Sequence, residues 1–192
     1  MDPSEKIESR VKDEVLAVFR TRKQLTRCAR NIKEIDDTTS ILLEQLICLL
    51  KEPVVDSLSR EILHHCRLIV ETMVNRLLQT CKIPYSSTLH YQLKWLKKAC
   101  KMFGPRNANA INRWTENVRS IKEHLNIASH ATSKYLSISI VLSTIEVIYS
   151  LASNYPSIIT TLIELTKNSK TPCRFFIMSE CKNLQCTFAH QF

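Results

Sequence analysis

The sequence ILLEQLICLL, residues 41–50, is apolar on most sides of an α-helix. A helix that is apolar all round is usually buried, so we expect this one at the centre of the core. Asp36, Asp37 and Thr38 stand just before it and can cap a helix over residues 39–51, because their side-chain oxygens accept hydrogen bonds from free backbone N–H groups. The other helices are then expected to pack around this one.

Helical periodicity continues on both sides of this segment. Residues 2–35 carry apolar side chains at three- and four-residue steps, as on one long helix. The same pattern predicts further helices over residues 53–80, 87–103, 107–129, 132–154 and 156–167, with Pro156 dividing the last two. The chain has one Gly and six Pro, too few turn residues for a strand-rich fold. The sequence therefore predicts an all-α fold, a multi-helix bundle of about seven helices in a basic α-helical domain over residues 1–167.

The charge of the chain favours a polyanionic partner. Its formal net charge is +9, which suits nucleic acid or an acidic membrane surface. Residues 1–15 are polar and charged, unlike a signal peptide. We therefore expect a reducing compartment, the nucleus or the cytoplasm, in which isolated cysteines stay reduced. The cysteines expected to be such buried thiols are Cys28, Cys48, Cys66, Cys81 and Cys100.

Two segments concentrate basic residues. The first, in the helix expected over residues 2–35, holds Arg20, Arg22, Lys23, Arg27, Arg30 and Lys33. It fits a solvated helix face, a phosphate-contacting face or one helix of a dimer. The second holds Lys94, Lys97, Lys98, Lys101, Arg106, Arg113, Arg119 and Lys122, against Glu116 alone. Among these, we predict that Lys97, Lys98 and Lys101 contact the phosphates of a nucleic acid.

Aromatic residues are interleaved with the second basic segment. Cations with aromatic rings suit single-stranded nucleic acid, whose phosphates meet Lys and Arg while the bases stack. The aromatics here are Tyr91, Trp95 and Trp114. Trp114 is in register with apolar residues of its helix, so we expect it in the core. Trp95 is the better candidate for the surface.

Residues 132–166 are rich in Ser, Thr and branched apolar residues and carry few charges. A membrane-spanning helix needs about 20 mostly apolar residues. Polar residues, among them Ser137, Ser143 and Glu146, interrupt this run. We therefore expect core or partner-binding helices here and no membrane partner.

A metal-ligand pattern occupies the end of the chain. Cys173, Cys181, Cys186 and His190 follow one another within TPCRFFIMSECKNLQCTFAHQF, residues 171–192. Three thiolates and one imidazole can surround Zn²⁺ tetrahedrally, and a segment this short would obtain its folding free energy from the metal. We therefore predict that these four residues bind Zn²⁺ as a cofactor, in a small domain over residues 170–192.

This stretch resembles a CCCH zinc finger of the tristetraprolin-like RNA-binding proteins. The residues that match are Lys170, Thr171, Cys173, Arg174, Phe176, Cys186, Phe188, Ala189 and His190. The resemblance covers only residues 170–191. It implies that single-stranded RNA binds the finger by stacking on Phe176 and Phe188, with Arg174 and Lys182 nearby. Ser179 to Leu184 lack the Gly and the aromatic-Gly pair of the family, so one stacking platform is missing.

Enzymatic activity is not expected. The chain has no Gly-rich phosphate loop and no G-x-S-x-G or H-E-x-x-H motif. Three Cys and one His would also fill the zinc shell, which leaves no position for a catalytic water.

The leading hypothesis is a zinc-dependent accessory protein that binds single-stranded RNA through the finger and a basic helical surface. Two alternatives remain. The first is a helical protein-interaction scaffold that a structural zinc knot completes. The second follows from a similarity in parts to the transcription processivity factors of pneumoviruses and filoviruses, in which the finger precedes the helical domain. That similarity implies self-association through helices, or a protein partner.

Overall fold

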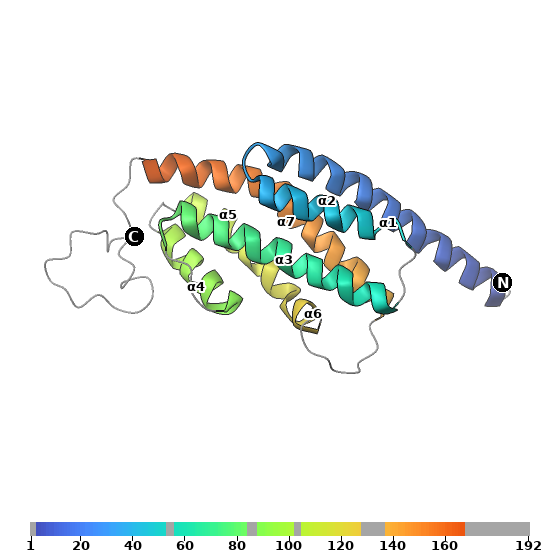
Figure 1. Cartoon of the computed structure of the whole chain (residues 1–192). Helices are drawn as coiled ribbons and strands as arrows, with labels where there is room; N and C mark the ends of the chain where they lie inside the picture. Colours follow the sequence, from blue (N-terminus) through green and yellow to red (C-terminus); the bar gives the residue numbers. More distant parts are fainter. Residues whose placement is uncertain (1–2, 53–55, 84–87, 102–104, 128–136, 168–192) are drawn as a thin grey trace, which may run out of the picture. The chain divides into compact units, whose positions relative to one another are not determined.

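The computed structural model describes residues 3–52, 56–83, 88–101, 105–127 and 137–167. Across these ranges there are seven α-helices and no strand, which confirms the all-α class for this part of the chain (Figure 1). The helices are α1 (Pro3–Lys33), α2 (Asp37–Leu49), α3 (Asp56–Thr80), α4 (Leu89–Cys100), α5 (Pro105–Ser120), α6 (Lys122–Ile127) and α7 (Ile138–Lys167).

The chain divides into two compact units. Unit 1 comprises Met1–Leu68 and Ile121–Ser153, and unit 2 comprises Ile69–Ser120 and Asn154–Phe192. Helices α3 and α7 are each divided between the two units, after Leu68 and after Ser153. The basic residues of α4 and α5 thus belong to unit 2, whereas those of α1 belong to unit 1.

In unit 1, α1 and α2 form a helical hairpin and lie side by side (Figure 1). Asp36 caps α2, as expected: its carboxylate accepts hydrogen bonds from the Thr39 backbone N–H at 3.1 Å and the Thr39 hydroxyl at 2.7 Å. The Ser40 hydroxyl donates to the Ala29 carbonyl at 2.9 Å, and both residues are buried. Small side chains at this contact let the two helices approach closely.

The expectation that α2 lies at the centre of the core is wrong, because only one of its sides is buried. Leu43 and Leu46 are fully buried, but Ile41 is 47% exposed. Leu42 and Leu49 are half-buried. Only one side of α2 faces the core of unit 1, because α1 and the other helices of this unit cover that side alone. Apolar composition therefore overstated the burial of this helix.

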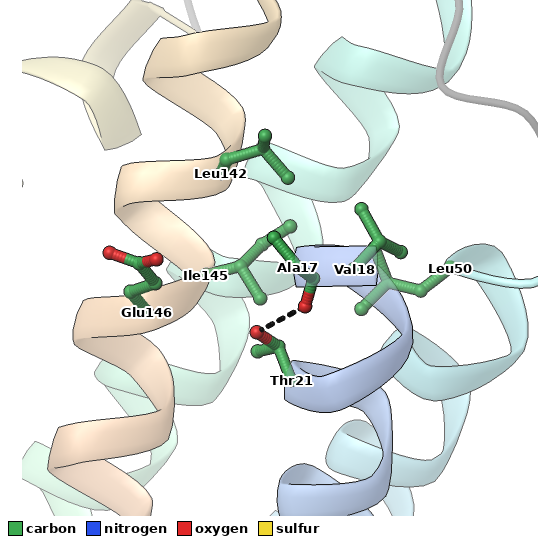
Figure 2. A pocket seen from close by; sticks show the side chains of 7 residues that line it. All are labelled: Ala17, Val18, Thr21, Leu50, Leu142, Ile145 and Glu146. Atoms are coloured by element: carbon green, nitrogen blue, oxygen red, sulfur yellow. Dashed lines mark hydrogen bonds between the residues drawn. The ribbon is translucent and has the colours of Figure 1, made fainter. Parts of the chain in front are cut away.

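Helix α7 borders a small cavity within unit 1 (Figure 2). Ile145 lines it from α7, Ala17 and Val18 line it from α1, and Leu50 closes the end of α2. Figure 2 shows the Thr21 hydroxyl donating to the Ala17 carbonyl, at 2.9 Å. The cavity measures about 40 Å³, far below the roughly 300–1,000 Å³ of small-molecule sites. It is a packing void and offers no site for an organic ligand.

The core of unit 2 is built from the second halves of α3 and α7 together with α4 and α5. Its fully buried side chains include Met73, Leu77, Leu96, Tyr155 and Leu162. Helix α3 ends in a reversal in which Lys82 has φ of 57° and the Ile83 N–H donates to the Leu78 carbonyl at 2.9 Å. Glycine normally occupies this left-handed position, and a lysine stands there in a chain with a single Gly.

Two predicted helix boundaries are wrong. The helix expected over residues 107–129 is divided into α5 and α6 by a turn at Ile121, which is where the chain passes from unit 2 to unit 1. The helices expected over residues 132–154 and 156–167 are one helix, α7, with Pro156 inside it. A proline within a helix loses one hydrogen bond and costs about 3 kcal/mol. Burial of Tyr155 and Ile159 on either side offsets that cost.

The isolated cysteines are free thiols, and four of the five are buried. Burial raises the pKa of the Cys66 thiol to about 12. A hydrogen bond with Cys81, followed by burial, raises the pKa of Cys100 well above its ordinary value. The prediction of burial is wrong for Cys48, which is exposed because it lies on the side of α2 that the core does not cover.

Candidate nucleic-acid interface

The lysines of α4 and its C-terminal end gather on one side of this helix. Leu93, Leu96 and Cys100 face the core, and the lysines lie at three- and four-residue steps on the other side. We call Lys94, Lys97, Lys98 and Lys101 the lysine face. Lys94 and Lys101 are exposed, and Lys97 and Lys98 are half-buried. The structure thus places the three predicted phosphate contacts, Lys97, Lys98 and Lys101, together on one surface.

Glu116 of α5 engages the lysine face. The Lys97 ammonium donates to the Glu116 carboxylate of α5, and the Arg119 guanidinium donates to the same oxygen at 3.1 Å. The hydrogen bond from Lys97, followed by the charges of Lys97 and Arg119, lowers the pKa of Glu116. Glu116 is therefore a carboxylate at neutral pH and offsets part of the charge of Lys97. Lys97 therefore joins α4 to α5.

The aromatic residue that accompanies the lysine face is Tyr91, and the expectation that Trp95 lies at the surface is wrong. Trp95 is only 5% exposed, whereas Tyr91 is 49% exposed. Gln92 and Ala99, which are one turn away from Trp95, are buried as well, so the buried side of α4 is wider than its leucines alone indicated. Trp95 belongs to the core.

The Tyr91 ring lies near two neighbouring rings. Its centroid lies 6.4 Å from that of Trp95, with 35° between the planes, and 5.4 Å from that of His90, with 77° between them. Tyr91 precedes Lys94 by three residues and Lys98 by seven, so it lies in line with the lysine face. This spacing was visible in the sequence and could have identified Tyr91, because a ring at these steps must share the side of the lysines.

Two further features predicted from the sequence lie in the described residues: Trp114 and the basic residues of α1. Trp114 is 3% exposed, which confirms that it lies in the core. In unit 1, the basic residues of α1 form an exposed line, with Arg20, Lys23, Arg27 and Arg30 at three- and four-residue steps. The Arg22 guanidinium lies 5.8 Å from the centre of the Phe19 ring. The structure therefore contains a second basic surface. It differs from the lysine face because its helix also carries exposed apolar residues.

The predicted zinc finger lies outside the described residues. This applies to the ligands Cys173, Cys181, Cys186 and His190 and to the predicted RNA contacts Arg174, Phe176, Lys182 and Phe188. Elsewhere, in the part of the chain that the structure describes, no three His, Cys, Asp or Glu side chains are grouped to hold a metal ion. His64 is exposed and Cys66 fully buried, so these near neighbours point to different sides of α3.

Helix α7 has the length and composition of a membrane-spanning helix, with 30 residues and a mean hydropathy of 1.2 in its most apolar stretch. The core helix of a globular protein can have the same properties. Here Ile148 is fully buried in unit 1, and Tyr155 and Leu162 are fully buried in unit 2. These side chains contribute to the protein core.

Comparison of the chain with protein-family models, with curated proteins and with solved structures gives no match. The functional argument therefore depends on the residues of this chain: the lysine face with Tyr91, and the Cys and His pattern at the end of the sequence.

Proposed function

We propose that this chain is a zinc-dependent accessory protein that binds single-stranded RNA. The observation that carries the proposal is the lysine face of α4 with the exposed Tyr91 ring at its start. Unpaired RNA presents phosphates to cations and bases to flat rings, and an amphipathic helix with both groups in one line offers the matching surface. The C-terminal Cys and His residues support the same function, because their pattern resembles a zinc finger that binds single-stranded RNA.

The lysine face is expected to supply the salt-dependent part of the affinity. Changing Lys94, Lys98 and Lys101 together to Gln removes three cations, and should weaken binding to a short oligouridine by at least about tenfold. Each phosphate contact with single-stranded RNA contributes about 0.7 to the slope of log affinity against log salt, so this slope should fall by about two. Fluorescence anisotropy titrations at several salt concentrations measure both quantities.

A control variant with the same net charge as the first triple variant shows whether the loss comes from direct contacts of the lysine face with RNA or from the lower net charge of the protein. Lys51, Lys82 and Lys167 are exposed and dispersed over the chain, so changing these three to Gln lowers the net charge equally without touching the lysine face. This variant should bind RNA nearly as well as the wild type. Equal losses in the two triple variants would contradict a specific role for α4.

Tyr91 is expected to stack on a base. Stacking of a base on an aromatic side chain is worth about 1–3 kcal/mol, so Tyr91→Ala should weaken oligouridine binding roughly tenfold. Tyr91→Phe keeps the ring and should bind like the wild type. Because stacking involves no ionic contact, the salt slope should not change in either variant. Wild-type affinity in Tyr91→Ala would show that this ring does not contact RNA.

A second candidate function, a protein-interaction scaffold or a self-associating factor, is favoured by one feature of α1. Val15, Leu16 and Phe19 are 62%, 51% and 58% exposed and lie within two turns of the helix. Exposed apolar residues that are adjacent on a helix are typical of surfaces that bind other helices. Light scattering at high protein concentration tests self-association directly, and a monomer at all concentrations argues against that form of this function.

A further inference from the structure

Unit 2 contains a cleft of about 300 Å³ between α5 and the second half of α7. The α5 wall is formed by Arg113, Trp114 and Asn117, and the α7 wall by Asn154, Ser157 and Ile158. In each helix these residues recur at steps of one, three or four, which places them on one side of the helix. The volume is at the lower end of the range for small-molecule sites, which suits one compact group.

The cleft is apolar at its base and polar at its rim. Trp114 and Ile158 are 3% and 8% exposed and supply apolar surface. Arg113, Asn117, Asn154 and Ser157 are exposed and supply a guanidinium, two amides and a hydroxyl. Among the lining residues the charged one is Arg113, and none is acidic. A complementary ligand therefore has apolar surface, carries both hydrogen-bond donors and acceptors, and bears no positive charge.

We propose that this cleft binds one unpaired purine base of RNA, an inference that rests on the proposed function. Arg recognises the O6 and N7 atoms of guanine with two hydrogen bonds, and Asn pairs in the same way with N6 and N7 of adenine. A base that is splayed out of a single strand exposes these atoms and needs apolar surface for its rings. The Arg113 fork, the Asn117 amide and the apolar base of the cleft offer that combination.

The lysine face lies on α4, which is a neighbour of the helix that forms one wall of the cleft. Helix α5 packs against α4, and the hydrogen bond between Lys97 and Glu116 joins them. Arg113 precedes Glu116 by three residues on α5, so the cleft begins one turn from this link. A strand whose phosphates follow the lysine face can therefore place a nearby base in the cleft. The lysine face then provides affinity for any sequence, and the cleft provides preference for a purine.

The test compares two oligomers with the full-length protein. One is a short oligouridine, and the other is the same oligomer with one central guanosine. We expect the wild type to bind the guanosine oligomer about tenfold more tightly, the change that one two-bond contact to a base produces. Arg113→Lys keeps the charge but loses the planar fork, so it should abolish this preference and leave oligouridine affinity unchanged. Ala110→Phe, at an exposed residue that also lines the cleft, should fill the cleft and have the same effect.

The matched control is Arg119→Lys, the same substitution on the same helix outside the cleft. It keeps a cation beside Glu116 and should retain the purine preference. If the wild type binds both oligomers equally, or if Arg113→Lys and Ala110→Phe retain the preference, the cleft does not bind a base, while the proposed function stands. If neither oligomer binds the wild type, the proposed function itself is overturned.

Discussion

Removal of zinc is expected to have the largest effect on this protein. The purified chain should contain one zinc ion, and a strong chelator should remove it and weaken binding to single-stranded RNA by at least about tenfold. The physical reason is that a segment as short as residues 170–192 has too few apolar residues for a core of its own. Zinc binding to such segments is worth about 10–16 kcal/mol, and this free energy would maintain the positions of Phe176 and Phe188 against RNA.

Helical circular dichroism should change little on chelation, because α1 to α7 bury their own apolar side chains. Cys181→Ser should lower the zinc content measured by elemental analysis, since a hydroxyl is a much poorer ligand than a thiolate. Cys48→Ser is the matched control, because Cys48 is exposed on α2 and lies outside the predicted ligand set. Full zinc content in Cys181→Ser, or absence of zinc from the wild type, would refute the zinc finger.

The second large effect is expected when a substitution opens a new cavity in the core of unit 1. Leu46 of α2 is fully buried, and truncation of such a leucine to alanine removes apolar contacts and leaves a void. Leu46→Ala should therefore lower the free energy of unfolding by about 2–5 kcal/mol. Chemical denaturation followed by circular dichroism measures this loss.

Leu49→Ala provides the comparison within the same helix. Leu49 is half-buried and lies on the partly exposed side of α2, so the same truncation removes fewer contacts. We expect a loss well below that of Leu46→Ala. Equal losses would mean that α2 is covered on both sides in solution, as its composition first suggested, and that another molecule or a second copy packs against Ile41.

The candidate site illustrates how far local sequence reasoning reaches. Lysines at three- and four-residue steps must share a side of a helix, so the sequence alone implies that Lys97, Lys98 and Lys101 lie together; that they contact RNA stays a prediction. Whether a given ring joins them depends on how wide the buried side of α4 is. That width is set by the helices that pack against α4, and they bury Trp95 and leave Tyr91 exposed.

The sequence alone determined the all-α class, the position of most helices and the Asp36 cap, because these depend on apolar periodicity and on backbone groups a few residues away. Only the tertiary structure decided which side of α2 is covered, that α7 continues through Pro156, that Lys97 pairs with Glu116, and that α5 and α7 leave a cleft beside Arg113. These features arise from contacts between residues far apart in the chain, and local spacing holds no information about which distant surfaces meet.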